Sequence, residues 1–408
     1  MRLPIMDTHV ADVSLLRFGR LEQPVAFVDC RQLVDVLPRY FRNWNIVDVS
    51  DTGDVDPIIT VTRSSTGYDV SASWLKPSLH RRDDVDVVCA LIAELIRASV
   101  DADTEYLCLH AAAVEIAGRL VVFPNPFRAG KSLLCACLAS HGCRIFADDV
   151  IPLVGSVASA CAPGVLPRLR LPLPESLASE THTFLACHRG PSNSHYLYLD
   201  LPKTHLFEHG ERAAIGAVVL LNRLDDGPAL LEPITRSRAL RQTIWQNFGR
   251  ESGPVQILSR LQTAVSRTAV CYQLDYARVD DAAQLLLTEF LKQDATPPIA
   301  SILSSVPQGR DLSSTTTLPA AGSCQRRTGL SETRMDGELY LADNRTGAIH
   351  QLDSIGMAIW DLLAEPTTPE QVSAELSLAF PDVPHARIAE DVAALLHTLA
   401  KKRLISRL

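Results

Sequence analysis

A short loop between an apolar segment and a helix-forming segment constrains the fold of this chain more than any other feature. The segment LVVFP, residues 120–124, has the composition of a buried strand, and KSLLCACLASHG, which begins at Lys131, is typical of a helix. The next apolar segment, CRIFADDVIPL, predicts a further strand. Strand, tight loop, helix and strand in this order predict a βαβ-like unit and hence an α/β fold.

The loop itself, residues 125–132, reads NPFRAGKS. Backbone N–H groups of such a loop and of the first helical turn converge on phosphate, and the helix dipole favours negative charge there. In this arrangement Lys131 is expected to reach the outer phosphates of ATP, and the Ser132 hydroxyl is expected to bind Mg²⁺. The predicted nucleotide contacts are Asn125, Arg128, Ala129, Gly130, Lys131, Ser132 and Leu133.

The first loop position holds Asn125, where the phosphate-binding motif usually has glycine. Asparagine tolerates positive φ better than other non-glycine residues, so we expect the loop to form with Asn125 in that place. Arg128 either adds a cation for the phosphates or points outward. The alternative to a nucleotide site is an ordinary strand–turn–helix connection in which Gly-Lys-Ser is accidental.

Two carboxylates, Asp148 and Asp149, end the apolar strand CRIFADDV. Beside a phosphate-binding loop, one carboxylate can hold Mg²⁺ and the other can accept the proton of an attacking hydroxyl. We predict Ser132 and Asp148 as Mg²⁺ ligands and Asp149, or Asp148, as the base. A solvated strand end is the alternative. His110 precedes the loop, and a lone histidine is more often structural than catalytic.

The sequence LHAAAVEIAGRLVVFPNPFRAGKS…HGCRIFADDVIPL resembles the catalytic core of HPr kinase/phosphorylase-related proteins. Those proteins carry a histidine, a phosphate-binding loop and Ala-Asp-Asp at the spacing seen here. The likeness covers roughly residues 106–153 and continues more weakly to about Phe290. It implies a nucleotide-dependent kinase that phosphorylates a serine hydroxyl, with His110 assisting the acidic pair. The predicted catalytic residues are Asp149, Asp148, His110 and Lys131. Arg168 and Arg170 are candidates for phosphate or substrate contacts and, equally, for exposed loop cations.

The C-terminal part, from about residue 326, predicts three short strands followed by three helices, a small winged-helix-like α+β fold. Asn344–Gly347 predicts a turn between two of the strands. A winged helix that reads DNA would need a basic recognition helix, but residues 367–380 contain Glu370 and Glu375 and no Lys or Arg.

This C-terminal part resembles the PqqD family of peptide-recognition elements. The resemblance rests on Leu341-Ala-Asp343, His350-Gln-Leu352-Asp353, Ile359-Trp360 and the closing residues 402–405. It implies that the leader of a precursor peptide binds as an added strand, with the helix from His385 to Ala400 as the other wall of the groove. The predicted peptide-binding residues are Ala348, Ile349, His350, Gln351 and Leu352.

These segments predict an α/β N-terminal subdomain (1–100), an HPr kinase-like P-loop domain (101–292), a linker rich in Ser, Thr, Pro and Ala (293–323) and a PqqD-like domain (324–408). Within the first subdomain, Val25–Val28 and residues 57–61 predict strands, and residues 85–98 predict a helix.

The net charge of −8 over 408 residues argues against nucleic-acid binding. No stretch is apolar enough for a membrane span or a signal peptide, so we expect a cytoplasmic protein with reduced thiols. Zinc binding by Cys135, Cys137, Cys143 and His141 is disfavoured, because residues i and i+2 of a helix do not share a face.

Together these patterns predict an ATP- and Mg²⁺-dependent kinase that phosphorylates a Ser or Thr hydroxyl of a ribosomally synthesised precursor peptide. The PqqD-like domain would hold the leader, and the linker would raise the effective concentration of the core at the kinase site. Asn125 and Leu133 keep two alternatives open: a peptide-binding chaperone with a degenerate kinase site, and a nucleotide-gated scaffold. Further partners under this hypothesis are other maturation enzymes and additional copies of the chain.

Overall fold

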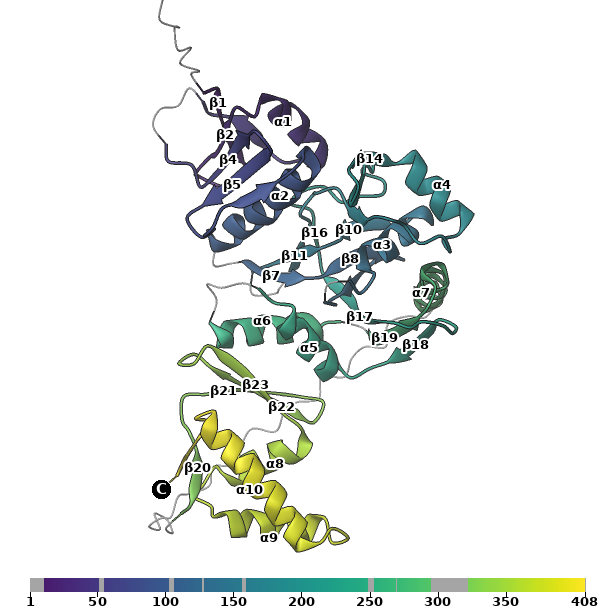
Figure 1. Cartoon of the computed structure of the whole chain (residues 1–408). Helices are drawn as coiled ribbons and strands as arrows, with labels where there is room; N and C mark the ends of the chain where they lie inside the picture. Colours follow the sequence, from purple (N-terminus) through teal and green to yellow (C-terminus); the bar gives the residue numbers. More distant parts are fainter. Residues whose placement is uncertain are drawn as a thin grey trace, which may run out of the picture. The chain divides into compact units, whose positions relative to one another are not determined.

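The computed structural model describes residues 11–50, 55–102, 106–126, 128–155, 159–248, 253–268, 270–294 and 322–407. The chain divides into two compact units, residues 1–252 with 260–296 and residues 253–259 with 297–408. Figure 1 colours the chain from purple at the N-terminus to yellow at the C-terminus. Most of the predicted linker, residues 295–321, lies outside the described residues.

The N-terminal part of the first unit is a six-stranded sheet. Its strands are β1 (Val13–Phe18), β2 (Val25–Val28), β3 (Ile46–Asp48), β4 (Ile59–Ser64), β5 (Gly67–Ala72) and β6 (Leu79–Arg81). They are ordered β3-β1-β2-β4-β5-β6, with β2 and β4 parallel and the other pairs antiparallel. Between β2 and β3 lie the short helix α1 (Arg31–Val36) and the 3₁₀ helix η1 (Leu37–Tyr40).

Helix α2 (Asp84–Asp101) packs against β5 and β6 (Figure 1). It begins after Asp83, whose side chain accepts a hydrogen bond of 2.9 Å from the Asp86 N–H, a typical N-cap. Acidic residues in its first turn are favoured by the helix dipole. The predicted helix at residues 85–98 and the predicted strand Val25–Val28 are both confirmed.

A second six-stranded sheet carries the predicted phosphate-binding loop. Its strands are β8 (Ala112–Ile116), β9 (Arg119–Phe123), β10 (Arg144–Ala147), β17 (Ile215–Arg223), β18 (Leu230–Pro233) and β19 (Val270–Tyr276). The order is β10-β8-β9-β17-β19-β18, and β9, β17 and β19 run parallel. The helix α3 (Lys131–Ser140) connects β9 to β10, so the predicted strand–loop–helix–strand order is confirmed. The two strands do not pair directly, because β8 lies between them.

A four-stranded sheet lies beside it, ordered β16-β12-β11-β7. Its strands are β7 (Tyr106–His110), β11 (Val150–Val154), β12 (Ser159–Cys161) and β16 (Arg212–Ala213). The chain passes from this sheet to the larger one at the fully buried Ala111, between β7 and β8. It passes back at Asp148 and Asp149, between β10 and β11. The single strand predicted for CRIFADDVIPL is therefore wrong, because the two aspartates interrupt it where the chain changes sheets.

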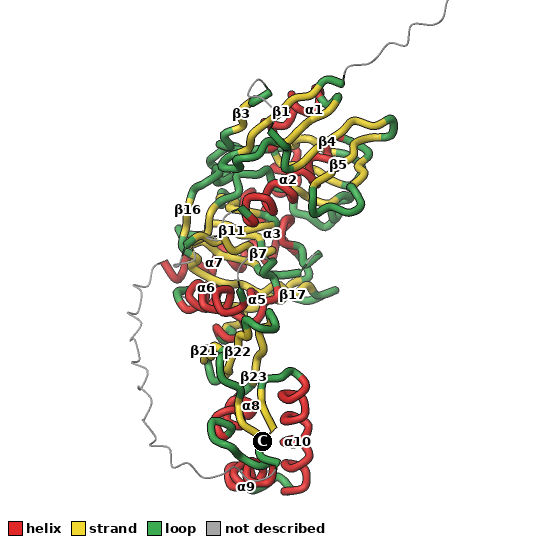
Figure 2. The backbone as a smooth tube through the Cα atoms, turned by 90° about the vertical axis from the view of Figure 1, so that its left-hand side faces the viewer, coloured by secondary structure: helices red, strands yellow, loops and turns green. Residues whose placement is uncertain are grey.

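The first unit contains further strands and helices, which Figure 2 draws in yellow and red. A three-stranded sheet is formed by β13 (Arg168–Arg170), β14 (Arg189–Ser192) and β15 (Tyr196–Leu199). The further helices are α4 (Ser179–Cys187), α5 (Arg236–Trp245) and α7 (Val279–Asp294), and α6 (Pro254–Ser266) is divided between the two units after Ser259. Helix α3 packs against both α4 and α7.

Asp280, in the first turn of α7, connects these three helices. Its carboxylate accepts hydrogen bonds from the Ala178 N–H (2.9 Å), the Thr181 hydroxyl (2.9 Å) and the Cys137 thiol (3.3 Å). Burial raises the pKa of Asp280, but the three hydrogen bonds outweigh it and the pKa is lowered overall. The ionised carboxylate is therefore the form that stabilises the fold.

Replacing Asp280 by alanine is expected to lower the free energy of unfolding by about 2–4 kcal/mol, because buried donors lose their acceptor. Asp281→Ala is the matched control: Asp281 forms an exposed ion pair with Arg278, and its loss is expected to cost under about 1 kcal/mol. Chemical denaturation of the two variants above pH 5 measures the difference, since the Asp280 carboxylate is ionised there in both the folded and the unfolded state. Equal stability of the two variants would contradict this account.

The second unit contains a three-stranded antiparallel sheet, a two-stranded sheet and three helices. The strands are β20 (Cys324–Arg326), β21 (Ser331–Met335), β22 (Glu338–Asp343), β23 (Ala348–Leu352) and β24 (Ile405–Arg407), and the helices are α8 (Ser354–Leu362), α9 (Pro369–Ala379) and α10 (His385–Lys401). The predicted turn at Asn344–Gly347 connects β22 to β23. The pairing of β20 with β24 was not predicted.

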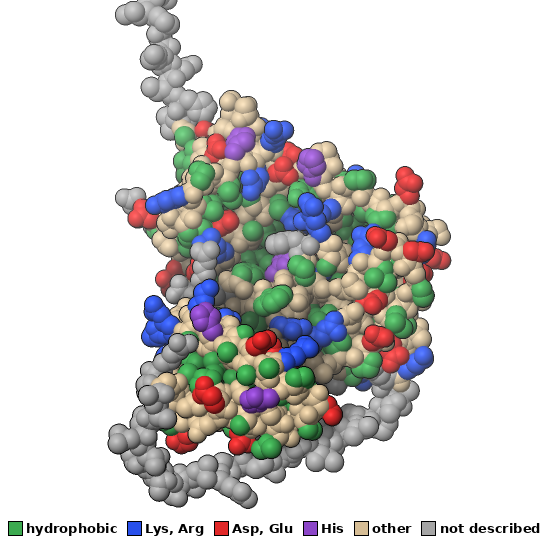
Figure 3. Space-filling view, turned by 60° about the horizontal axis from the view of Figure 1, so that its bottom comes forward, with side chains coloured by type: hydrophobic (Ala, Val, Ile, Leu, Met, Phe, Trp, Pro, Cys, Tyr) green, Lys and Arg blue, Asp and Glu red, His purple; other side chains and the backbone are tan. Residues whose placement is uncertain are grey.

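Basic and acidic side chains both appear on the face of the molecule drawn in Figure 3, in keeping with 39 Lys and Arg against 47 Asp and Glu in the sequence. Within the described ranges, no helix combines the length and the apolar character needed to cross a membrane.

Candidate active site

The loop before α3 adopts a left-handed backbone at two described positions, Arg128 (φ 68°) and Gly130 (φ 86°). A side chain at Gly130 would place its Cβ 2.5 Å from the hydroxyl of Tyr276, which donates a hydrogen bond of 3.0 Å to the Ala129 carbonyl. Positive φ and this close approach both require glycine at position 130. Phe127 lies outside the described residues.

The sequence suggested that Asn125 replaces glycine because it tolerates positive φ. Its backbone is not in the left-handed region, so its role in the loop is a different one. Its side chain instead binds the backbone of Leu221: the amide nitrogen donates to the Leu221 carbonyl (2.8 Å) and the Leu221 N–H donates to the amide oxygen (2.9 Å). Asn125 thereby continues the parallel pairing of β9 with β17 past the end of β9. The residue fixes the start of the loop by pairing rather than by its φ angle.

Lys131 begins α3 and is 6% exposed. Its ammonium donates to the carbonyl of Asn125 (2.7 Å) and of Pro126 (3.1 Å), and lies 3.0 Å from Nε2 of His110. Burial lowers the pKa of Lys131 to about 8, although the charges of Asp149 and Asp148 act to raise it. A poorly solvated cation at a helix N-terminus suits an anionic ligand.

His110, the last residue of β7, lies between Lys131 and Asp149. Its Nδ1 is 3.3 Å from a carboxylate oxygen of Asp149, and its Nε2 faces Lys131. Burial and the charge of Lys131 lower the pKa of His110. The imidazole is then neutral near pH 7, and its Nε2 accepts from Lys131, so its Nδ1–H donates to Asp149. This orientation holds the half-exposed Asp149 carboxylate in place.

Asp148 occupies a different environment from its neighbour. Its carboxylate accepts a hydrogen bond of 2.8 Å from the Arg168 N–H and another from the Ser132 hydroxyl. Burial, and next the charge of Asp149, raise the pKa of Asp148 to about 7. The two adjacent carboxylates therefore differ: Asp148 is buried and has a raised pKa, whereas Asp149 is half-exposed and faces a histidine.

These observations test whether the residues fit a nucleotide and Mg²⁺. The glycine-dependent loop, the α3 N-terminus and the buried Lys131 ammonium match an anionic phosphate ligand. The Asp148 carboxylate and the Ser132 hydroxyl are adjacent oxygen ligands of the kind that Mg²⁺ prefers. A divalent cation would also favour the ionised form of the Asp148 carboxylate, which burial and the charge of Asp149 disfavour. The residues present fit both groups. The side chain of Leu133, by contrast, packs against the hydrophobic core.

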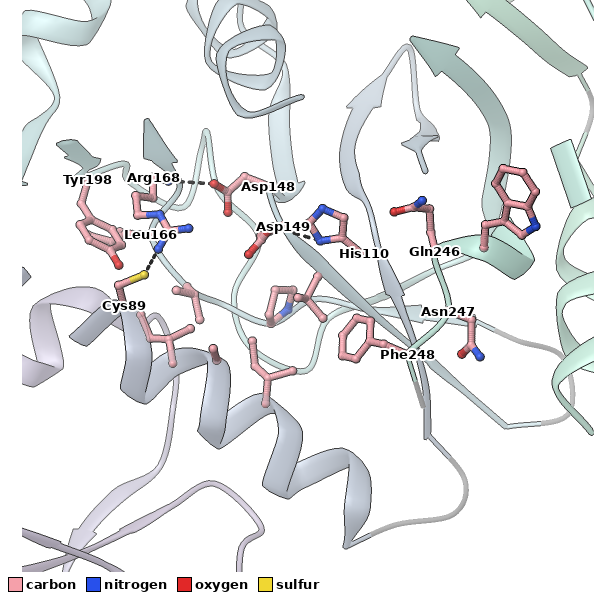
Figure 4. Close-up of a pocket in the computed structure, with 17 residues that line it drawn as sticks. Cys89, His110, Asp148, Asp149, Leu166, Arg168, Tyr198, Gln246, Asn247 and Phe248 are labelled. Carbon is pink, nitrogen blue, oxygen red and sulfur yellow. Dashed lines mark hydrogen bonds and ion pairs between the residues drawn. The ribbon is translucent and has the colours of Figure 1, made fainter. Parts of the chain in front are cut away.

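A cavity of about 440 Å³ adjoins the acidic pair (Figure 4). Asp148, Asp149 and His110 lie together on one side of it, and α2, the helix that carries Cys89, lies on the opposite side. The segment after α5 contributes Gln246 to Phe248; the His110 N–H donates to the Gln246 carbonyl (2.8 Å) and the Phe248 N–H to the Cys108 carbonyl (3.1 Å). The sequence carried no motif for these contributions, because they depend on long-range packing. Trp245, at the end of α5, also lines the cavity and is 74% exposed.

The two arginines considered from the sequence have different positions. Arg168 lines the cavity, and its guanidinium lies 4.7 Å above the ring of Tyr196 and contacts the Cys89 sulfur. Arg170 is exposed but close enough to Lys131 to act on the pKa of that residue. Neither arginine is bound to a carboxylate through its side chain in any ion pair found among the described residues.

Cys135 and Cys137, which had raised the question of zinc, point into the core. Cys137 binds Thr181 and Asp280, and burial raises the pKa of both thiols. Within the described part of the chain, no group of three or more His, Cys, Asp and Glu side chains is arranged to hold a metal ion.

The predicted peptide-binding strand, β23, lies at the edge of its three-stranded sheet and pairs with β22. Its first four residues, 348–351, are half-buried. Burial and the charge of Lys402, the residue after α10, lower the pKa of His350, which places the C-terminal end of α10 near this strand. Asp343, at the end of β22, shapes the hairpin: its buried carboxylate accepts from the Arg345 N–H and the Thr346 hydroxyl, and it forms an ion pair of 2.6 Å with Arg327.

Comparison with known proteins identifies the C-terminal domain. Residues 338–405 match the model of the family described as coenzyme PQQ synthesis protein D (PqqD). The predicted PqqD-type domain is therefore confirmed over residues 338–405.

Two solved structures are among those similar to parts of the chain. TbiB1 in complex with the TbiA(beta) leader peptide is 28% identical, and the match covers 20% of this chain and 94% of that one, with a TM-score of 0.19. The Hpr(Ser) kinase/phosphatase from Coxiella burnetii is 14% identical, and the match covers 46% of this chain and 98% of that one, with a TM-score of 0.22. No curated protein gave a significant match.

Proposed function

We propose that this protein is a kinase that transfers a phosphoryl group from ATP to a Ser or Thr hydroxyl of a ribosomally synthesised precursor peptide. The observation that carries the proposal is the position of His110, which links the loop lysine, Lys131, to the carboxylate of Asp149. A cation suited to phosphate and a base suited to a hydroxyl thus lie on either side of one neutral imidazole. Phosphoryl transfer needs these two groups near one another.

In this proposal each residue has one task. Asp149 accepts the proton of the acceptor hydroxyl as its oxygen attacks phosphorus, and His110 holds Asp149 in position through the Nδ1–H bond. Lys131 and the N–H groups of the loop neutralise the phosphate oxygens. Asp148 and Ser132 would hold Mg²⁺. ATP supplies the phosphoryl group and Mg²⁺ supplies charge neutralisation at the phosphates.

The PqqD-type domain supports a peptide rather than a small molecule as the acceptor. Its edge strand β23 offers unpaired backbone groups to an extended segment, the arrangement required for strand addition. The leader of the precursor peptide is the proposed ligand, and its core carries the acceptor hydroxyl. Leader binding would raise the concentration of the core around the kinase site.

The experiment that tests the proposal is mass spectrometry of the precursor peptide encoded beside the gene, after incubation with the full chain and Mg-ATP. The expected result is a gain of one or more phosphates on Ser or Thr, absent when ATP or Mg²⁺ is omitted. An unmodified peptide that still binds through its leader would overturn the kinase proposal and favour a peptide-binding chaperone. An unmodified peptide whose affinity changes with ATP would favour a nucleotide-gated scaffold.

The lowered pKa of Lys131 predicts a pH-dependent nucleotide affinity. With a pKa of about 8 in the free protein, Lys131 loses its charge as the pH rises above 8, whereas bound phosphate would keep it protonated. Nucleotide binding then takes up a proton, and affinity is expected to fall by up to about tenfold per pH unit above pH 8. Calorimetric titration at pH 7, 8 and 9 measures this. Lys131→Met should bind more weakly without this dependence, and a pH-independent wild-type affinity would contradict the assignment.

Strand addition at β23 predicts a periodic response to methylation of the leader backbone. Alternate residues of an added strand point their N–H groups at the edge, so N-methylation at those positions removes a hydrogen bond each. We expect a loss of about 2- to 13-fold in leader affinity at every second position. Intervening methylated positions serve as matched controls and should bind as the unmodified leader does. Fluorescence anisotropy of labelled leaders measures both sets, and a response without the two-residue period would argue against strand addition.

A further inference from the structure

The cavity beside the acidic pair has a polar part and an apolar part. Asp148, Asp149 and His110 form one polar group, and Arg168, Tyr198, Gln246 and Asn247 also line the cavity. None of the described lining residues belongs to the phosphate-binding loop, residues 125–132. His110 lies between the two regions, with Lys131 on its Nε2 side and Asp149 on its Nδ1 side. The cavity therefore opens on the side of the acidic pair that is away from the lysine.

We infer that this cavity is the acceptor site and that it binds an aliphatic or aromatic side chain directly beside the hydroxyl residue that is phosphorylated. The inference rests on the proposed kinase activity and adds to it the class of peptide sequence that the enzyme selects. The acceptor hydroxyl lies beside the acidic pair, within reach of Asp149. The apolar neighbour occupies the part of the cavity that is lined by apolar side chains.

The apolar part of the cavity is formed by three separate segments of the chain. Helix α2 contributes Ile92, Ala93 and Ile96 from one face, since residues i and i+4 share a side of a helix. The segment before β13 contributes Val165 and Leu166. Phe248 closes another side, and it is 41% exposed in the free protein. Ala93 and Phe248 are exposed beside a reactive carboxylate, and exposed apolar side chains in a cavity favour a ligand that covers them.

The size of the cavity fits a short peptide segment. Its volume of about 440 Å³ lies within the range of about 300–1,000 Å³ that is typical of ligand sites. Asp148 and Asp149 would repel an acidic residue directly beside the acceptor, whereas the guanidinium of Arg168, which also lines the cavity, contacts Tyr196 and Cys89. An apolar neighbour removes the exposed walls from water without burying a charge.

The experiment uses the full chain and a library of precursor-peptide variants that keep the leader and carry Leu, Phe, Gly or Asp on either side of the modified Ser or Thr. Variants Ala93→Phe and Ala186→Phe run alongside the wild type. Ala93 is an exposed residue of α2 that lines the cavity, so a phenyl group there fills the cavity without disturbing the core. Ala186 is an equally exposed residue of α4 outside the cavity and serves as the matched control.

For the wild type and for Ala186→Phe, kcat/KM is expected to be at least about tenfold higher with Leu or Phe beside the acceptor than with Gly or Asp. In Ala93→Phe this ratio is expected to fall towards one. Phosphorylation without such a preference, or a preference that survives Ala93→Phe, would overturn the inference and leave the kinase proposal standing. A parallel loss of nucleotide affinity in Ala93→Phe would assign the cavity to the nucleotide instead. Absence of phosphate on every peptide with the wild type would refute the kinase proposal, and the inference with it.

Discussion

Replacing Asp149 by asparagine is expected to lower kcat for phosphoryl transfer by about 10²- to 10⁴-fold, the range typical of a lost general base. Asparagine has nearly the same shape, and its amide oxygen can still accept the hydrogen bond from His110 Nδ1. The variant therefore keeps the local geometry and loses the capacity to take the proton. Initial rates of phosphopeptide formation at saturating Mg-ATP measure the effect.

The neighbouring aspartate provides the matched control. The charge of Asp149 helps to raise the pKa of Asp148, so its removal leaves Asp148 more fully ionised and Mg-ATP binding at least as strong. Asp148→Asn should instead raise the Mg²⁺ concentration needed for half-maximal rate. A wild-type rate for Asp149→Asn, or the same Mg²⁺ defect in both variants, would show that the two carboxylates do not have the separate roles proposed here.

The local elements of the site could be predicted from the sequence because each depends on a few neighbouring residues. The strand LVVFP, the loop and the helix from Lys131 follow from apolar patterning and turn chemistry, and the structure places them in that order. The PqqD-type domain was recognised from short motifs, and the family match agrees. His110 could be predicted as a catalytic residue only from its spacing relative to the loop, because nothing in its neighbouring residues distinguishes it.

The long-range parts of the site could not be predicted in the same way. The sequence indicates a strand end at Asp148 and Asp149, but it does not show that the next strand, β11, pairs with β7 in a different sheet from β10. The role of Asn125 depends on Leu221, which lies 96 residues further along the chain. The contribution of Ile92 to the cavity is hidden for a similar reason: its apolar face looks like ordinary core packing until the partner segments are known.

Replacing Lys131 by methionine is expected to lower kcat/KM by about 10²- to 10³-fold, the cost typical of losing one group that stabilises transition-state charge. Methionine is apolar and of similar length, so it suits a position that is 6% exposed. Loss of the ammonium also removes one of the influences that lower the pKa of His110, and a protonated His110 would bind the Asp149 carboxylate more tightly. Asp149 would then be a weaker base, and the charge of the phosphate would be less well neutralised.

Two readouts separate this role from a structural one. Leader affinity should be unchanged in Lys131→Met, because Lys131 and the PqqD-type domain belong to different compact units. Nucleotide affinity should fall, and the pH at which the rate rises to half its maximum should move upward, because a protonated His110 must lose its proton before Asp149 can act. Unchanged nucleotide affinity together with lost transfer would place Lys131 outside the phosphate site. Loss of leader binding would instead indicate that the substitution disturbs the fold.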